Sequence, residues 1–172
     1  MMRYFWGLLI VFFAVISCKS EDDSLQRIDQ IMNIYMKDSA GQDLLNAKKK
    51  GSFTSYSVND LFGTKDVSPV SIPLKVTADS LFYMEYIGGA KRIRMDSISP
   101  DNPGTGTSYF SRMQITFVKS TNASDNVTGT LEIQYRNTPT LFQVSKVLYD
   151  GTAVFTKGAD QPNSINNVTI IK

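Results

Sequence analysis

Residues 109–117 read Tyr-Phe-Ser-Arg-Met-Gln-Ile-Thr-Phe, and after a loop at 119–126 residues 127–136 show the same alternation of apolar and polar side chains. The alternating apolar residues are Tyr109, Met113, Ile115 and Phe117 in the first stretch and Val127, Leu131, Ile133 and Tyr135 in the second. Successive side chains of a strand point to opposite faces, so each stretch predicts a strand with one buried face. Together they favour an antiparallel pair of half-buried strands.

Further strand signals lie on both sides of this pair. They occur at about residues 31–37, 53–58, 70–76, 141–149, 152–156 and 168–171. Asp150-Gly151 predicts a type I′ turn between two of these strands, and Pro73 indicates an edge strand because proline cannot donate to a ladder. The pattern predicts an all-β fold: a single immunoglobulin-like β-sandwich of about nine or ten antiparallel strands, formed by residues 31–172.

Residues 25–36 leave two interpretations open. Leu25, Ile28, Ile31 and Tyr35 have the spacing of an amphipathic helix, and Asp23 with Gln26 has the spacing of a capping box. The later residues are rich in strand formers and precede a turn, which favours a strand at 31–37.

Residues 81–98 predict a second hairpin that turns at Gly88-Gly89. A two-residue turn fixes the register and places Met84 opposite Ile93, Glu85 opposite Arg92, and Tyr83 opposite Arg94. The apolar set would then face the core, namely Phe82, Met84, Ile93 and Met95. The charged and aromatic pairs would face solvent.

The block Lys37-Asp-Ser-Ala-Gly-Gln-Asp-Leu-Leu-Asn46 combines a glycine turn with two leucines. We expect Leu44 and Leu45 to be buried under one end of a sheet. The block resembles one found in small Bacteroidetes lipoproteins of unassigned function, and that resemblance implies a position between the first two strands of a sandwich-like domain.

The chain begins with Arg3, an apolar run at 4–16, and the small residues Ser17 and Cys18. This is the layout of a secretory signal peptide, and the run is shorter than the roughly 20 apolar residues of a membrane-spanning helix. Val15-Ile16-Ser17-Cys18 resembles the lipobox of bacterial lipoproteins. The resemblance implies that residues 1–17 are removed, that Cys18 is acylated and anchors the protein in the membrane, and that residues 18–30 form a tether.

The acidic run Glu21-Asp22-Asp23 follows the predicted lipid anchor. It resembles the export signal of Bacteroidetes-type surface lipoproteins, which implies an outer-membrane protein exposed at the cell surface. A charged run would also form a solvated tether without any signalling role.

Composition excludes several kinds of chemistry. The chain has no His and one Cys, which excludes catalysis of the Ser-His-Asp and Cys-His kinds and any His-ligated metal. Loss of Arg3 with the signal lowers the formal net charge from +2 to +1, so no nucleic-acid partner is expected.

Loops at 101–102, 122–126 and 160–167 carry oxygen ligands but match no calcium pattern, and we expect no cofactor and no metal. Glu85 and Glu132 are carboxylates on predicted strands, and nothing singles them out as a catalytic pair.

Four Asp-Ser-apolar triplets resemble the acceptor of Bacteroidetes O-glycosylation, and their serines are Ser24, Ser39, Ser80 and Ser97. Asp-Ser is also an ordinary turn sequence. Among the tyrosines, only Tyr83 is expected to face outward as a sugar-binding platform would.

These features predict a non-enzymatic, lipid-anchored surface protein that serves as a binding or adhesion module or as an accessory of the outer membrane. One alternative is a glycan-capture accessory beside an outer-membrane transporter, which would need exposed aromatic side chains. A carboxylate-based hydrolase is a further alternative and would need two facing acids.

Overall fold

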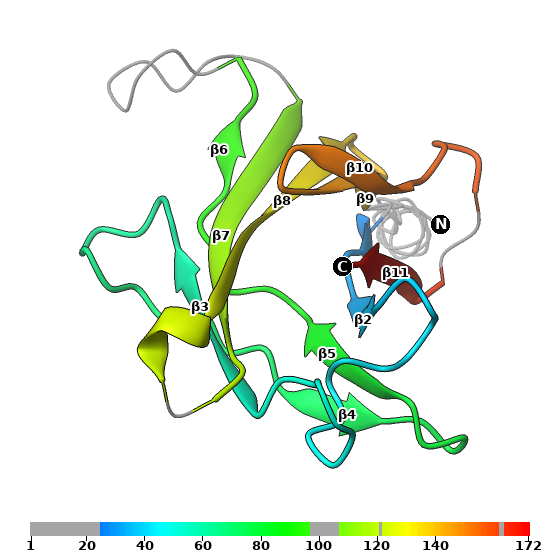
Figure 1. Ribbon diagram of the computed structural model, residues 1–172. Coiled ribbons are helices and arrows are strands. Elements are labelled where there is room, and N and C mark those ends of the chain that lie inside the picture. Colours follow the sequence, from blue (N-terminus) through cyan, green and yellow to red (C-terminus); the bar gives the residue numbers. More distant parts are fainter. Residues whose placement is uncertain (1–24, 97–106, 121, 162–163) are drawn as a thin grey trace, which may run out of the picture.

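The computed structural model describes residues 25–96, 107–120, 122–161 and 164–172. Within these ranges the chain forms eleven strands in two sheets and one short 3-10 helix, η1 (Ala123–Asp125). Figure 1 shows the larger sheet curving around the smaller one. The prediction of an all-β, sandwich-like fold is confirmed.

The larger sheet has seven strands, and the long antiparallel pair β7–β8 lies at its centre. Its strands are β1 (Arg27–Asp29), β9 (Leu141–Tyr149), β8 (Val127–Asn137), β7 (Ser108–Val118) and β3 (Ser55–Asp60), with β10 (Thr152–Thr156) beside β9 and β6 (Ile93–Arg94) beside β7. The predicted alternation holds here, since Met113, Ile115, Leu131 and Ile133 are all fully buried.

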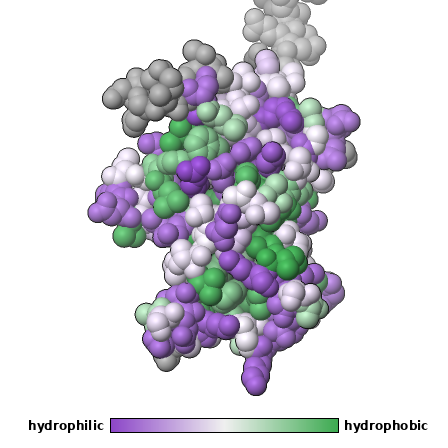
Figure 2. Space-filling model, turned by 45° about the horizontal axis from the view of Figure 1, so that its top comes forward, coloured by the Kyte–Doolittle hydropathy of each residue, from purple (hydrophilic) through white to green (hydrophobic). Residues whose placement is uncertain are grey.

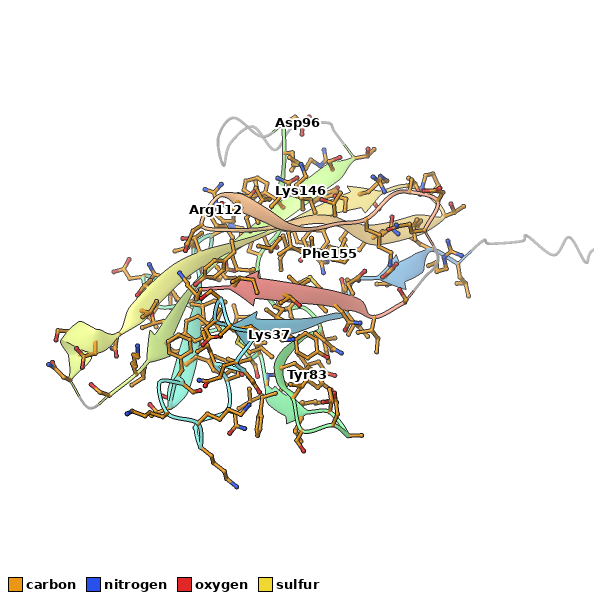
Figure 3. The ribbon with its side chains drawn as sticks, turned by 45° about the vertical axis from the view of Figure 1, so that its right-hand side comes forward. Lys37, Tyr83, Asp96, Arg112, Lys146 and Phe155 are labelled. Carbon is orange, nitrogen blue, oxygen red and sulfur yellow. The ribbon has the colours of Figure 1, made fainter. Side chains whose placement is uncertain are left out.

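The smaller sheet has four strands in the order β11 (Asn166–Ile171), β2 (Met32–Lys37), β5 (Phe82–Tyr86) and β4 (Leu74–Val76). Its inward side chains, among them Ile34, Met84 and Val168, are fully buried. Figure 3 shows side chains of the two sheets meeting between the layers. Of the residues labelled there, Arg112 and Lys146 belong to the larger sheet, and Lys37 and Tyr83 belong to the smaller sheet.

The hairpin predicted at Gly88-Gly89 is wrong. The usual two-residue hairpin turns, types I′ and II′, both need a positive φ at the first central residue, and Gly88 does not have one, although Gly89 does, at 113°. The chain instead crosses between the sheets: β5 pairs with β2 and β4, whereas β6 pairs with β7. A carboxylate oxygen of Asp60 helps to hold the crossing segment by accepting a hydrogen bond from the backbone N–H of Lys91 at 2.6 Å.

The side-chain pairs predicted for that hairpin are therefore also wrong. Met84 lies opposite Ile34 and Leu74 rather than Ile93, and Met95 is 49% exposed. Glu85 forms an ion pair with Lys75 at 2.7 Å. Arg92 and Arg94, predicted to pair with Glu85 and Tyr83, have other neighbours. The guanidinium of Arg92 lies over the rings of Tyr135 and Phe142, and the Nε of Arg94 donates a hydrogen bond to the hydroxyl of Tyr109.

Two strand pairs depart from the predicted all-antiparallel arrangement. β11 pairs with β2 in parallel, and β1 pairs with β9 in parallel. β1 also lies within the predicted tether, so the ordered sheet begins at residue 27 and not at 31. The open choice at residues 25–36 is resolved as strand, because 27–29 and 32–37 form β1 and β2.

Other local predictions are confirmed. β9 and β10 form the hairpin at Asp150-Gly151, with positive φ at both residues. In the block at 37–46, Leu44 and Leu45 are buried as expected, but the block joins β2 to β3 and so does not lie between the first two strands. The buried carboxylate of Asp43 accepts the backbone N–H groups of Leu45 and Phe82.

The segment at 70–76 is only partly as predicted. Of it, only Leu74–Val76 forms a strand, β4, which pairs with β5 at the edge of its sheet in the described part of the chain. Val70 and Ile72 are buried as expected, but Leu74 and Val76 are exposed. The alternation of Val70, Ile72, Leu74 and Val76 with polar residues and Pro73 predicts one buried face for the whole segment, and this prediction is wrong for its second half.

Candidate functional site

An apolar rim lies where the described chain begins. It consists of four exposed side chains, Leu25, Ile28, Ile31 and Ile165, and Leu25 is 91% exposed. Three of these residues line an open hollow of about 210 Å³ together with Asp29, Gln30 and Ser164. The rim therefore gathers apolar surface at the end of the molecule that follows the predicted lipid anchor.

A buried polar cluster lies directly behind this rim, and we name it the Lys157 cluster. It contains Asp29 at the end of β1, Lys157 just after β10, Asn166 at the start of β11, and Gln143 on β9. The Nζ of Lys157 lies 2.6 Å from Asp29 Oδ2 and 3.0 Å from Asn166 Oδ1. Asn166 Nδ2 donates to Asp29 Oδ1 at 3.0 Å. The cluster joins both sheets, since β11 belongs to the smaller sheet and β1, β9 and β10 to the larger.

A second hollow, of about 380 Å³, lies on the outer side of the larger sheet, and we name it the Arg112 hollow. It is lined by Leu61, Arg112, Thr130, Glu132, Leu148, Asp150 and Gly151. Outward side chains of β7, β8 and β9 supply most of the lining, and Figure 3 shows how Arg112 projects from the sheet. The hollow therefore presents charged and apolar groups side by side.

The charges in the Arg112 hollow are already paired. Both Nε and Nη2 of Arg112 donate to Glu132 Oε2, at 3.1 and 2.6 Å, and Gln134 donates to Glu132 Oε1 at 2.8 Å. Burial opposes ionisation of Glu132, but the hydrogen bonds from Gln134 and Arg112 and the Arg112 charge outweigh it and lower the pKa of this carboxyl. Glu132 is thus an ionised, oriented acceptor.

The two strand carboxylates do not form a catalytic pair. Glu132 lies on β8 of the larger sheet and Glu85 on β5 of the smaller, and each is bound to its own cation. A hydrolase would need two acids that face one another across a substrate.

Aromatic side chains do not form a free platform in the described ranges, where every Phe and Tyr is at least half-buried. Tyr83 packs against Tyr35, with ring centroids 5.6 Å apart, rather than against Arg94. Phe62 and Phe110 lie near the Arg112 hollow but meet edge to face, and the Arg112 guanidinium lies over both rings. On the face seen in Figure 2, apolar surface is divided into separate patches by polar residues.

The predicted modification sites are only partly within the described residues. Ser39 and Ser80 are exposed, and each follows an Asp in a turn. The carboxylate of Asp38 accepts the backbone N–H groups of Ala40 and Gln42, so turn geometry accounts for this Asp-Ser pair. Cys18, Ser24 and Ser97 lie outside the described residues.

The predicted oxygen-rich loops are not brought together as a metal site. Residues 122–126 form η1 and its caps, and residues 101–102 lie outside the described part. Over the described ranges, no group of three or more His, Cys, Asp and Glu side chains is placed to hold a metal ion. In the same ranges, no helix is long and apolar enough to cross a bilayer.

Sequence reasoning missed the Lys157 cluster altogether. Its members are separated by up to 137 positions, and Asp29 falls within the predicted tether. No local signal marks Lys157, because the side chains of β10 do not alternate between buried and exposed and the strand carries a register shift between Ala153 and Phe155. Comparison of the chain with protein-family models, with curated proteins and with solved structures found no match.

Proposed function

We propose that this protein is a non-enzymatic binding module, held at the surface of the outer membrane by lipid on Cys18. The lipobox-like sequence at 15–18 and the acidic run after it support the anchor and the surface location. The partner is a protein or glycan outside the membrane.

The observation that carries the proposal is the position of the apolar rim. From Cys18 to Leu25 there are seven Cα–Cα steps, so whatever their conformation they span at most about 25 Å. An acylated Cys18 would therefore hold this end of the domain near the bilayer. Exposed Ile28, Ile31 and Ile165 at this end are suited to contact with lipid.

The Arg112 hollow is the surface best placed for the partner. β9 starts beside β1, near the anchor, and ends at Tyr149. Leu148 and Asp150 of the hollow therefore lie about 20 Å along the strand from the anchored end. A hollow in this position would face away from the membrane, and its oriented Arg112–Glu132 pair offers a partner both donors and acceptors.

A non-enzymatic role is supported by the chain's inventory of reactive groups. The sequence has no His, and its one Cys is the predicted lipid site. The carboxylates Glu85 and Glu132 are each held by a cation. These groups suit recognition better than proton transfer to a substrate.

The anchor is tested by labelling cells with palmitate. We expect wild-type protein and a Ser20→Ala control to take up label, and Cys18→Ala to take up none and to accumulate as precursor. Label retained in Cys18→Ala would contradict the proposal. A variant with Glu21, Asp22 and Asp23 replaced by Ala should keep its lipid but lose cleavage by protease added to intact cells.

The partner surface is tested with a photo-crosslinking residue in the protein's own cells. We expect an adduct from Leu148 in the Arg112 hollow and none from Thr169, which is exposed on the smaller sheet. Adducts from Thr169 alone would place the partner on the other sheet, against the proposal. A sugar-only adduct from Leu148 would identify a glycan partner.

A further inference from the structure

We propose that Lys157 and Asn166 become joined by an isopeptide bond that the folded protein forms by itself, with Asp29 relaying the protons. The inference stands apart from the membrane anchor and from the partner surface. It rests on the three side chains at the centre of the Lys157 cluster.

The first observation is burial. The side chains of Lys157 and Asp29 are 4% and 2% exposed, and Asn166 is 2% exposed. An ion pair accounts for the lysine and the carboxylate, since buried charges are kept in pairs. The ion pair does not explain why the carboxamide of Asn166 contacts both Lys157 and Asp29.

The second observation is the orientation of that carboxamide. Asn166 Nδ2 donates to Asp29 Oδ1 and to the backbone oxygen of Ile31, both at 3.0 Å. A carboxylate and a carbonyl only accept, so the nitrogen must face them and Oδ1 must face Lys157. The Nζ of Lys157 lies 3.0 Å from Oδ1, and the carbonyl carbon is one bond of about 1.2 Å beyond that oxygen.

The third observation is that Asp29 bridges the amine that would attack and the nitrogen that would leave. Its Oδ2 accepts from Lys157 Nζ at 2.6 Å, and its Oδ1 accepts from Asn166 Nδ2 at 3.0 Å. One carboxylate can therefore take a proton on one oxygen and deliver it from the other. Gln143 Nε2 lies 3.5 Å from Oδ2 and helps to fix its position.

The reaction balances without any external reagent. Asp29 takes a proton from the Lys157 ammonium, and the free amine attacks Cγ of Asn166. The Nζ–Cγ bond forms and the Cγ–Nδ2 bond breaks. The two protons lost by Nζ pass through Asp29 to Nδ2, which leaves as an ammonium ion, and Asp29 returns to its carboxylate form. Because folding holds the reacting groups together, the step is effectively unimolecular and benefits from their proximity.

The bond would tie the two sheets together. Lys157 follows β10 of the larger sheet, and Asn166 opens β11 of the smaller. The cross-link lies behind the apolar rim, at the end of the domain where β1 enters. The two sheets could then no longer separate at this end when the chain is pulled.

Trypsin digestion of the denatured full chain tests the bond directly. An unmodified chain is cut after Lys157 and releases peptides 147–157 and 158–172. The isopeptide blocks that cut, so we expect a single peptide 147–172 that is lighter than its sequence by one ammonia molecule. Simple cyclisation of an Asn also loses ammonia but leaves the cut at Lys157 intact. Complete cleavage after Lys157 in the wild-type chain would overturn the proposal, and this result needs no variant to fold.

Variants assign the roles. Asn166→Ala should restore cleavage after Lys157, whereas its neighbour Asn167→Ala should leave the cross-link in place, because Asn167 is exposed on the other face of β11. Asp29→Asn keeps the shape of the side chain and removes the relay, so we expect cleavage at Lys157 to return. A cross-link that persists in Asp29→Asn would overturn the relay, and one that persists in Asn166→Ala would overturn the proposed bond.

Discussion

The amino nitrogen of Lys157 lies 2.6 Å from a carboxylate oxygen of Asp29, although 128 positions separate the two residues in the chain. The pair joins the first strand, β1, to the end of β10, and both side chains are almost fully buried. Asp29, which the sequence places in the tether, is therefore part of the core network. A force applied to the N-terminal end of the domain would therefore act on the Lys157 cluster through Asp29.

Two methionines distinguish the observed crossing from the predicted hairpin. Met84 is fully buried on β5, whereas Met95 is 49% exposed after β6. We expect Met84→Ala to lower the free energy of unfolding by about 2–5 kcal/mol, because it leaves a cavity. Met95→Ala should change it by less than about 0.5 kcal/mol. Urea unfolding of both variants makes the comparison, and equal losses would support the hairpin instead.

Gly129 on β8 makes room for the ring of Tyr149. A Cβ at this position would lie 1.9 Å from the Tyr149 hydroxyl oxygen and 2.2 Å from Cζ. Gly129 and Tyr149 are both buried, so we expect Gly129→Ala to lower the free energy of unfolding by roughly 1–3 kcal/mol through overpacking. Thr128→Ala is the matched control, since Thr128 is the exposed neighbour on the same strand. Thermal unfolding of the two variants at equal concentration measures the difference, and equal midpoints would mean that Tyr149 does not occupy this space.

Glu132 should make stability depend on pH in a defined direction. Its folded pKa is lowered, on balance, by hydrogen bonds from Gln134 and Arg112 that outweigh the effect of burial. A depressed folded pKa contributes stability above the unfolded pKa of about 4.3, and this contribution is lost as pH falls through the folded value. We expect Glu132→Gln to lower the free energy of unfolding at pH 7 by at most about 1 kcal/mol, since Arg112 is partly exposed. Urea unfolding as a function of pH should show this difference shrinking below about pH 4. A difference that grew on acidification would contradict the assignment.

The proposed orientation of the domain at a membrane can be tested with one fluorophore at two sites. Ile165 directly precedes β11 and is 54% exposed, and Ile171 is the last residue of β11 and is 58% exposed. Ile165 belongs to the apolar rim, whereas β11 ends next to Lys37, at the far end of β2. With Cys18 acylated, Ile165→Cys or Ile171→Cys supplies the only free thiol. We expect a polarity-sensitive label at 165, and not at 171, to shift to the blue when the lipidated protein enters vesicles. Equal shifts at both sites would contradict the proposed orientation.

The sequence predicts the local parts of this fold well. The β7–β8 pair follows from the alternation around Met113 and Leu131, and the Asp150-Gly151 turn follows from the φ angles that these residues tolerate. In both cases the deciding contacts join neighbouring stretches of chain. The burial of Leu44 and Leu45 is likewise predicted from the local sequence.

The remaining errors come from long-range pairing. The residues around Gly88-Gly89 have consistent faces as a hairpin, but β5 finds β2 and β4 as partners, and nothing local reveals that competition. The parallel pair of β11 and β2 joins the two ends of the domain. For the same reason, Asp29, Lys157 and Asn166 show no common motif, because only the assembled sheets bring them together.

The central claim, that the domain is held at a membrane through acylated Cys18, is tested most directly by the mass of the N-terminal peptide of the mature protein. The protein would be extracted from membranes of its own cells and digested with trypsin. We expect the first peptide to start at Cys18 and to carry acyl chains, with residues 1–17 missing from the mature protein. A mature chain that retains residues 1–17, or that carries an unmodified Cys18 thiol, would contradict the account.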